Sequence, residues 1–246
     1  MKIKGATALV TGGNRGLGQA LAEALRRDGA AKIYAAARDP ASVSPVKGVE
    51  PIALDVTNPS QVAAAAAKCR DVDILINNAG IASFTPALGA PTTDNARREM
   101  ETNYFGTLSM CRAFAPILKN NGGGALVNIL SVVSWFNAPM QATYCASKAA
   151  EWSLTKAVRF ELRAQGTLVM GVYAGYIDTG MTAGMTVVKS SPETIASAVL
   201  NGIKNGIEDL LADERARSVN AELRKDDRAF DANMQKLWDE TQRRKS

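Results

Sequence analysis

Two kinds of apolar pattern alternate along this chain. Short, β-favouring apolar runs occupy residues 6–10, 32–37, 51–56, 73–78, 125–131 and 167–174. Between them lie segments of helical periodicity, such as LGQALAEALRRDG, in which Leu17, Leu21 and Leu25 form one stripe. Continuous apolar strands are buried on both faces, and strands separated by helices need crossover connections. The pattern therefore predicts an α/β fold: a doubly wound, mostly parallel sheet between two helical layers, as an α/β/α three-layer sandwich.

The last part of the chain has a different pattern. Acidic and basic residues nearly balance over residues 213–246, which is typical of a solvated helix face. Within residues 219–241 apolar side chains recur at helical spacing: Val219, Leu223, Phe230, Met234, Leu237 and Trp238. This predicts a charged amphipathic helix, docked either on the protein's own core or on another subunit. No repeat or Pro-rich linker divides the chain, so we expect a single domain, residues 1–246, with 213–246 as its C-terminal helical extension.

Composition narrows the classes of protein to which the chain can belong. It has 246 residues, 46% of them hydrophobic, which suits one sizeable globular core. The net charge of +5 comes from scattered basic residues, so we expect no nucleic-acid partner. Cys69, Cys111 and Cys145 lack the spacing of a metal site or a disulfide framework. With no signal peptide and no apolar run of membrane-spanning length, we expect a cytoplasmic protein that binds neither a metal nor a membrane.

A glycine-rich segment, TGGNRGLG (residues 11–18), follows the first predicted strand and precedes the first predicted helix. A helix N-terminus offers free backbone N–H groups and the positive end of the helix dipole to a phosphate. Glycines allow a pyrophosphate to approach where a Cβ would block it. At this place in the chain the motif predicts a dinucleotide site.

The end of the second predicted strand bears on which dinucleotide binds. NAD-selective sites place a carboxylate there to accept from the ribose 2′-hydroxyl, whereas this chain has three alanines and then Arg38. Arg38 and, from the glycine loop, Arg15 can pair with a 2′-phosphate, which favours NADP(H). Alternatively, Arg38 pairs with Asp39. Asp55, after the third strand, either meets the adenine or hydrogen-bonds to its own backbone.

Tyr144 and Lys148 raise the question of proton transfer, because the chain contains no histidine. The two residues are four apart in ATYCASKAAEWSLTKAVRFEL and so share one face of a predicted helix. An ammonium beside a phenol favours the phenolate and can bring the pKa of a tyrosine towards neutrality. Such a pair can donate and accept protons, but taken alone it is also typical of an ordinary helix surface.

Several motifs together resemble those of the short-chain dehydrogenase/reductase family, in its NADP-dependent carbonyl reductase type. TGGNRGLG is similar to the family's TGxxxGxG loop, NNAG (residues 77–80) to its motif after the fourth strand, and YCASK to its YxxxK motif. Asn103 in ETNYFGT, and Ser131 thirteen residues before Tyr144, match the other two positions of the family's catalytic tetrad. The resemblance covers residues 5 to about 205 and implies a Rossmann fold.

The resemblance also implies a role for each site residue. Tyr144 would donate a proton as hydride arrives, Ser131 would orient the carbonyl oxygen, and Lys148 would hold the nicotinamide ribose and lower the pKa of the tyrosine. Asn103 would support a water that connects Lys148 to solvent. The residues expected to bind the cofactor are Gly12, Asn14, Arg15, Gly16, Leu17, Gly18, Arg38, Asp55, Val56, Asn77, Ala79, Tyr144, Lys148, Ile177 and Thr179.

The substrate-binding residues are expected among the side chains that flank these motifs. They are Ser131, Tyr144, Phe84, Val133, Trp135, Phe136, Met140, Met181 and Met185. Most are apolar and no arginine cluster lies among them, which favours an uncharged, hydrophobic ketone or aldehyde as the small-molecule substrate. For Trp135 and Phe136 the alternative is ordinary core packing.

The leading hypothesis is an NADPH-dependent carbonyl reductase that also oxidises secondary alcohols. One alternative is a 3-oxoacyl-(acyl-carrier-protein) reductase, for which Lys189 alone supplies the basic patch that an acidic partner needs. A non-enzyme alternative is an NADP-sensing regulatory protein, although such proteins typically lose the tyrosine or lysine kept here. The family's final strand and glycine–aspartate signature are replaced by IEDLLADERARSV. A homodimer through the helices containing Asn103 and Tyr144 is therefore favoured over a tetramer.

Overall fold

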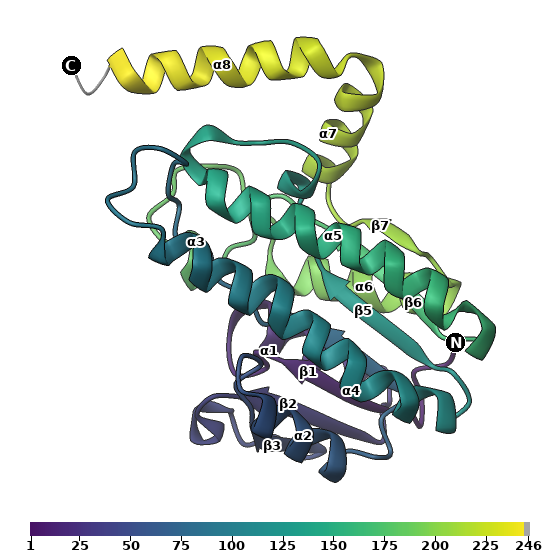
Figure 1. The fold of residues 1–246 in the computed structure, drawn as a ribbon. Helices are drawn as coiled ribbons and strands as arrows, with labels where there is room; N and C mark the ends of the chain where they lie inside the picture. Colours follow the sequence, from purple (N-terminus) through teal and green to yellow (C-terminus); the bar gives the residue numbers. More distant parts are fainter. Residues whose placement is uncertain (244–246) are drawn as a thin grey trace.

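The computed structural model describes residues 1–243, in which seven strands form one parallel sheet (Figure 1). In spatial order the strands are β3 (Val49–Ala53), β2 (Lys32–Ala37), β1 (Thr7–Thr11), β4 (Ile74–Asn77), β5 (Ala125–Ile129), β6 (Leu168–Tyr173) and β7 (Asp209–Leu211). The chain runs outward from β1 to β3 on one side and from β4 to β7 on the other. Ligands of such sheets bind beyond the carboxyl ends of the strands where this reversal occurs, here between β1 and β4.

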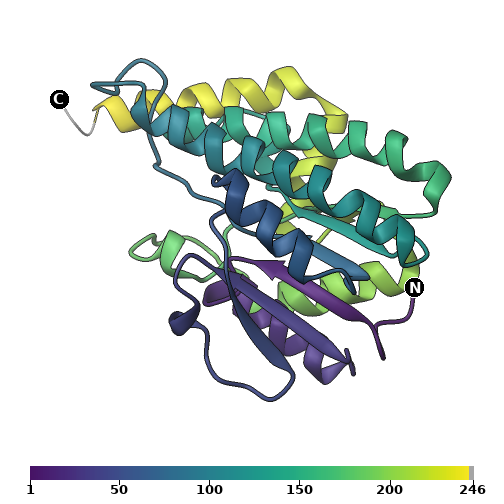
Figure 2. The same ribbon diagram turned by 60° about the horizontal axis from the view of Figure 1, so that its bottom comes forward.

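Helices cover both faces of the sheet, as the two ribbon views show (Figures 1 and 2). On one face lie α1 (Gly16–Arg27) and α6 (Pro192–Asn205); on the other lie α2 (Pro59–Lys68), α4 (Thr107–Asn120) and α5 (Ala142–Leu162). Side chains along each strand alternate between the two layers. Ile74 thus packs with α1 and α6, and Leu75 with α4 and α5. The predicted doubly wound sandwich is confirmed.

The helix that leads into α4 contains a wider turn. Asp94–Glu99 (α3) continues without a break through a π-helical segment, Met100–Gly106, into α4. Such π turns are rare and are found mostly at functional sites. Asn103 lies within this one. Gly106 closes it against Val56, since a Cβ at Gly106 would lie 2.7 Å from Val56 Cγ2.

The remaining elements are short turns and the C-terminal helices. The 3-10 turns are Pro40–Ser42, Val132–Ser134, Pro139–Gln141, Arg163–Gln165 and Gly180–Thr182. The C-terminal helices are α7 (Glu214–Lys225) and α8 (Asp227–Arg243). No helix in the stretch from residue 1 to residue 243 has the length and apolarity needed to cross a membrane.

Two expectations about the C-terminal third of the chain are wrong. The segment IEDLL does contain a further strand, β7, whose Leu211 pairs with Tyr173 of β6; it was missed because three residues, one of them acidic, give no clear pattern. The predicted single helix over 219–241 is two helices, because the backbone of Asp226 is extended and its carboxylate accepts from the N–H of Ala229 to start α8. Residues 244–246 of the expected extension lie outside the described residues.

The C-terminal helices dock on the protein's own core. Phe230 of α8 is only 4% exposed, and its ring centroid lies 4.8 Å from that of Phe136 in an edge-to-face contact. Val219 of α7 is fully buried in the same cluster. Farther along α8, Leu237 is 53% exposed. The first half of α8 therefore anchors the helix, and the rest of α8 extends across the top of the molecule in Figure 1.

We expect Phe230→Ala to lower the free energy of unfolding by about 3 kcal/mol, the usual cost of truncating a buried phenylalanine. Leu237→Ala is the matched control on the same helix and should change the free energy of unfolding by less than about 0.5 kcal/mol. Urea unfolding followed by circular dichroism measures both. Equal effects of the two substitutions would show that α8 is not anchored through Phe230.

Candidate active site

The turn after β1 is built so that only glycine fits at its key positions. Gly12 and Gly16 have φ angles of +63° and +54°, in the left-handed region that favours glycine. A Cβ at Gly18 would lie 2.0 Å from the carbonyl oxygen of Gly12. α1 then begins with no capping hydrogen bond from the side chain of Arg15 and no acidic residue in its first turn. The first N–H groups of α1 are thus free of side-chain partners and suited to an anion.

Asn78 ties this turn to the end of β4. Its Nδ2 donates to the carbonyl oxygens of Thr11, at 2.9 Å, and Gly12, at 3.3 Å. In return, the hydroxyl of Thr11 accepts from the backbone N–H groups of Asn78 and Ala79. The two strand ends at the reversal of the sheet are therefore held together by side-chain hydrogen bonds.

The side chain of Asn77, expected at the cofactor, points elsewhere. Alternation along β4 places it on the same face as Leu75, where it is 2% exposed. Its Nδ2 donates to Asn128 Oδ1 at 2.9 Å, while its own Oδ1 has no partner in the described structure. Asn78, not Asn77, brings its side chain to the glycine turn, and no sequence pattern distinguishes two adjacent asparagines at a strand end.

The arginines predicted to bind the adenosine end of the cofactor lie beside the glycine turn. Arg15 and Arg38 are exposed, and neither forms an ion pair within residues 1–243. The alternative pairing of Arg38 with Asp39 is not formed, because Asp39 caps its own turn through the N–H of Ala41. Both guanidinium groups are free to bind an anion.

Three other expected cofactor residues have structural partners. Asp55 accepts from the backbone N–H and the hydroxyl of Thr57 at 2.9 and 2.7 Å, so the backbone alternative for this residue is formed. The next residue, Val56, is buried against Gly106. Asn14 donates to the hydroxyl of Ser42 at 3.0 Å, which joins the glycine turn to the segment after β2.

The segment after β6 closes the other side of the site. Thr179 lies against Gly16, where a Cβ would be 3.1 Å from Thr179 Cγ2. Ile177 pairs with Ser190 in an isolated parallel bridge that folds the following loop back. Buried Leu17 begins the inner face of α1 beneath the turn. Of the two residues predicted for the cofactor in this segment, Thr179 thus lies beside the glycine turn.

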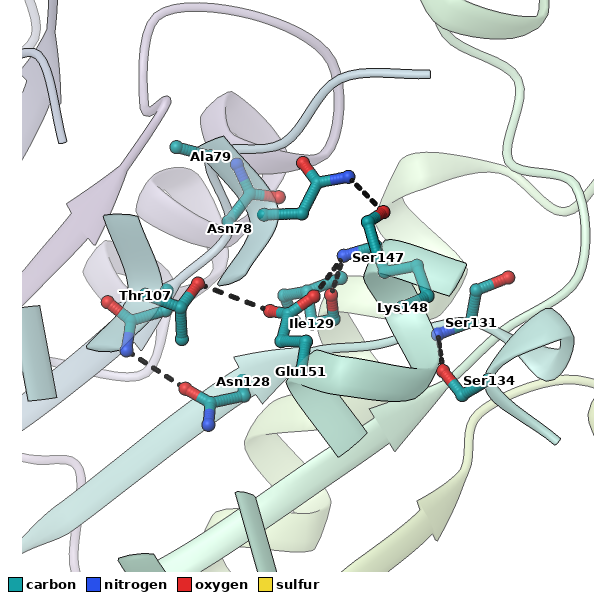
Figure 3. Close-up of polar contacts among 12 residues, drawn as sticks. Asn78, Ala79, Thr107, Asn128, Ile129, Ser131, Ser134, Ser147, Lys148 and Glu151 are labelled. Carbon is teal, nitrogen blue, oxygen red and sulfur yellow. Dashed lines mark hydrogen bonds and ion pairs between the residues drawn. The ribbon is translucent and has the colours of Figure 1, made fainter. Parts of the chain in front are cut away.

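Lys148 and Tyr144 lie on α5, and Ser131 follows β5. The Lys148 ammonium is 6.0 Å from the centroid of the Tyr144 ring. It donates to the carbonyl oxygen of Ile129 at 2.8 Å and to Glu151 Oε2 at 2.6 Å, as Figure 3 shows. The backbone N–H of Ser131 is held by the hydroxyl of Ser134. The expected tetrad positions therefore come together beyond the ends of β4 and β5, with Glu151 as an additional member.

Asn103, the fourth tetrad residue, holds the chain after NNAG. Its Oδ1 accepts from the N–H of Ile81, and its Nδ2 donates both to the carbonyl oxygen of Ile81 and to Ser147 Oγ, each at 2.9 Å. Both N–H donors are therefore used, and only Oδ1 can accept a further bond. Asn103 thus fixes the segment after β4 against α5.

Glu99, one turn before Asn103, continues this contact with the segment after β4. It is fully buried, and its Oε1 accepts from the N–H of Ser83 at 2.6 Å. Its Oε2 has no partner in the described part of the chain. Glu99 was not among the predicted site residues, because its position in a helix gives no sign that it faces inward.

The electrostatics of the tyrosine differ from the expectation. Burial raises the pKa of Tyr144, the Lys148 ammonium and hydrogen bonding with Ser131 lower it, and the Glu151 carboxylate raises it again, so that the net shift is upward. The pKa of Lys148 is also raised, because Glu151 and Tyr144 outweigh its burial. Lys148 does not bring Tyr144 towards neutrality in this structure, because burial outweighs the effect of its charge on the pKa of the phenol, and Glu151, 2.6 Å from the ammonium, partly offsets that charge.

Part of the expected substrate pocket is core. Trp135 stacks against Tyr173 with centroids 4.3 Å apart, Phe136 packs against Phe230, and Val133 is buried in the same cluster. The core-packing alternative for these aromatic residues is the observed one, because α7 and α8 cover them. Phe84, Met140, Met181 and Met185 stay partly or largely exposed.

Phe84 and Met140 flank the start of α5. The chain next to Phe84 is joined to it, because the N–H and hydroxyl of Thr143 both donate to the carbonyl oxygen of Thr85. Phe84 also has a φ of +49°, the one positive value outside glycine in the described chain. Gln141 Nε2, next to Met140, donates to the Tyr176 hydroxyl at 2.9 Å. The loops that carry these side chains are therefore held around Tyr144.

Cys145, beside the tyrosine, is a packing residue. It is 3% exposed, its Sγ accepts from the N–H of Ala138, and burial raises the pKa of its thiol. A thiol in that state is a poor nucleophile. No group of three His, Cys, Asp or Glu side chains suited to a metal ion occurs among residues 1–243.

Comparison with known proteins gives a consistent result. The family model for short chain dehydrogenase matches residues 6–188. A sorbitol dehydrogenase of Cereibacter sphaeroides is 34% identical over 189 residues, covering 72% of this chain and 73% of its own. A 3-oxoacyl-(acyl-carrier-protein) reductase FabG of Vibrio cholerae is 34% identical over 190 residues, covering 74% and 78%.

Solved structures extend the similarity to nearly the whole chain. A short chain dehydrogenase from Burkholderia cenocepacia J2315, in complex with NADP, has a TM-score of 0.92 and 40% sequence identity. The match covers 95% of this chain and 99% of that one.

We expect Gly18→Ala to lower the free energy of unfolding by about 2 kcal/mol, because the new Cβ meets backbone that must move. Gly180→Ala is the control, since nothing lies within 4 Å of a Cβ there and its effect should be under about 0.5 kcal/mol. Thermal or urea unfolding gives both values. A Gly18→Ala protein as stable as the control would show that the turn is looser than described.

Proposed function

Because the chain belongs to the short-chain dehydrogenase/reductase family of oxidoreductases, we propose that it transfers a hydride from NADPH to an uncharged, hydrophobic ketone or aldehyde. In the reverse direction it would oxidise secondary alcohols. The observation that carries the proposal is the meeting of a glycine turn at β1 with Tyr144, Ser131 and Lys148 beyond β4 and β5. These are the groups needed to bind a dinucleotide and to protonate a carbonyl oxygen beside it.

The free polar groups of the site fit NADP. The unoccupied N–H groups of the first turn of α1 suit the pyrophosphate, and the glycines leave the space that its approach needs. The exposed, unpaired Arg15 and Arg38 suit the 2′-phosphate, and the end of β2 holds only buried alanines. The structure of the similar Burkholderia protein in complex with NADP supports the same choice.

Each residue of the site then has a defined task. NADPH supplies the hydride when it is bound. Tyr144 Oη gives its proton to the carbonyl oxygen as the carbonyl carbon is reduced, and Ser131 Oγ holds the same oxygen in place. Lys148 keeps one N–H beyond those given to Ile129 and Glu151, which is available for the ribose or the phenol. Asn103 keeps the chain after β4 in position for the cofactor.

The electrostatics favour the reductive direction. Since the pKa of Tyr144 is raised, the phenol carries its proton at neutral pH and is ready to act as an acid. The side chains around it that stay partly open, Phe84, Met140 and Met185, are apolar. An apolar pocket with a protonated phenol suits a neutral carbonyl compound more than an acid or a phosphate ester.

The acyl-carrier-protein alternative draws support from the FabG relative. It would need exposed basic residues at the mouth of the site for the acidic carrier. Lys189, the residue considered for this, is paired with Asp178 at 3.3 Å and is largely covered. The charge distribution therefore favours a free small molecule. An assay with 3-oxoacyl thioesters on the carrier protein separates the two substrates.

A homodimer through α5 and the helix containing Asn103 is part of the proposal. Each helix exposes a phenylalanine on its outer side: Phe160 of α5 is 72% exposed and Phe105, in the π segment, 47%. Exposed aromatic side chains on adjacent helices are characteristic of subunit contacts.

We expect Tyr144→Phe to lower kcat for NADPH-dependent ketone reduction at least about 100-fold, since it removes the general acid. The measurement is NADPH loss across a panel of apolar ketones and aldehydes. Tyr104→Phe is the control, because the Tyr104 hydroxyl makes no hydrogen bond within residues 1–243. Equal NADPH loss by wild type and Tyr144→Phe would contradict the mechanism.

We expect Arg38→Asp to reduce kcat/KM for NADPH about 100-fold and to leave kcat/KM for NADH within about threefold, because it removes a charge-assisted hydrogen bond and adds repulsion at the 2′-phosphate. Steady-state kinetics with both cofactors gives the ratio. Arg70→Asp is the control. It makes the same charge change just before β4, at the amino-terminal ends of the strands, and should leave the ratio of kcat/KM for NADPH to that for NADH unchanged. An unaltered ratio in Arg38→Asp would remove Arg38 from the cofactor site.

A further inference from the structure

Glu151 is a buried acid that none of the motifs includes. It follows Tyr144 and Lys148 on the same face of α5, and its side chain is 2% exposed against 6% for that of Lys148. Its carboxylate lies between the Lys148 ammonium, at 2.6 Å, and the hydroxyl of Thr107 on α4, at 3.3 Å (Figure 3). The Lys148 ammonium of this ion pair is 6.0 Å from the centroid of the Tyr144 ring.

A buried carboxylate needs a reason beyond stability. An ion pair removed from water costs desolvation that its attraction only partly offsets, and apolar replacements are often as stable. In this site Glu151 decides where the ammonium sits, because Lys148 Nζ spends one N–H on Glu151 and one on Ile129. Burial raises the pKa of Glu151 and the Lys148 ammonium opposes that rise; in its ionised form the carboxylate places a negative charge within electrostatic range of Tyr144.

We propose that Glu151 is a positioning residue of the hydride-transfer site, which holds the Lys148 ammonium against Ile129 and keeps Tyr144 in its protonated, proton-donating form. The inference rests on the proposed function. Without the carboxylate, the full charge of Lys148 would act on the phenol and favour the phenolate. Glu151 thus adjusts a general acid that, in this chain, has no histidine to share its task.

The charged and titratable groups around Glu151 come from two elements, α5 and α4. Tyr144 and Lys148 share its helix, and Cys111 of α4 is close enough for Glu151 to raise the pKa of its thiol. From β5 the neutral carbonyl of Ile129 faces the ammonium. The acid nearest on α3, Glu99, acts on Cys145 instead. Lys148 and Tyr144 are therefore the groups that respond when Glu151 loses its charge.

The decisive variant is Glu151→Gln, which keeps the shape and the hydrogen bond to Lys148 but removes the charge. We expect Tyr144 to lose its proton at a pH lower by roughly one unit, the order of effect of one nearby buried charge. Ultraviolet titration of tyrosinate in the cofactor-free protein measures this, as the difference between each protein and its Tyr144→Phe counterpart. Glu151→Leu removes the same charge and serves as the second variant.

The same change should appear in the pH dependence of turnover. A lower pKa of Tyr144 moves the high-pH loss of ketone reduction to lower pH, again by roughly one unit, and raises alcohol oxidation at neutral pH by up to about tenfold. Glu161→Gln, an exposed residue of the same helix, should leave both profiles unchanged. Thr107→Val removes the hydrogen bond to Glu151 but not the carboxylate itself, and should move the titration much less than Glu151→Gln does.

The outcomes separate this inference from the proposed function. A Tyr144 titration that stays the same or moves to higher pH in Glu151→Gln overturns the inference, as does an equal shift in Thr107→Val, which would point to disrupted packing. A downward shift confined to the Glu151 variants supports it. If that shift occurs but no ketone is reduced by wild type, the proposed function is wrong while the link between Glu151 and Tyr144 stands.

Discussion

The burial of one ammonium group is the constraint around which the site is arranged. An isolated charge in a protein interior costs several kcal/mol, so Lys148, 5% exposed, requires partners on every side that water would otherwise fill. It obtains them from the carbonyl of Ile129 and the carboxylate of Glu151. The end of β5 and one face of α5 must therefore meet at a fixed distance. Gly80 packs close to the same ammonium group: a Cβ there would lie 3.8 Å from Lys148 Nζ and 3.2 Å from Asn103 Oδ1.

A series of hydrogen bonds between buried amide and hydroxyl groups fixes the rotation of α5 on the sheet. Asn77 donates to Asn128, Asn128 donates to Thr155, and the Thr155 hydroxyl donates to the carbonyl of Glu151. Each of these residues stands in otherwise apolar surroundings, where an unpaired polar group would be costly. A rotation of α5 would break these hydrogen bonds and would at the same time move Lys148 away from β5. The polar residues of β4 and β5 thus position the face of α5 that carries Tyr144 and Lys148.

Local patterns predicted the parts of the molecule that depend on local physics. The strands, the glycine turn and the tetrad positions follow from apolar periodicity, from glycine conformation and from motif spacing. The choice between Asn77 and Asn78 could not be predicted in this way, because it depends on the residue at which β4 ends. The packing of Trp135 and Phe136 could not be predicted, because Tyr173 packs against the first and Phe230, nearly a hundred residues away in sequence, against the second. The spacing of Lys148 and Glu151 was visible, but nothing in the sequence says that this pair is buried.

The C-terminal helices connect this site to a part of the chain that lies beyond residues 6–188, the segment that the family model matches. The segment from Ser131 to Tyr144 is held from inside by β5 and α5 and from outside by Val219 and Phe230. The curated relatives match about three quarters of the chain, whereas the Burkholderia structure leaves unmatched a stretch shorter than α7 and α8 together. Proteins that keep the four motifs but end differently must support this segment in another way. In this chain the side chains between Ser131 and Tyr144 therefore depend for their positions on how α7 and α8 pack against them.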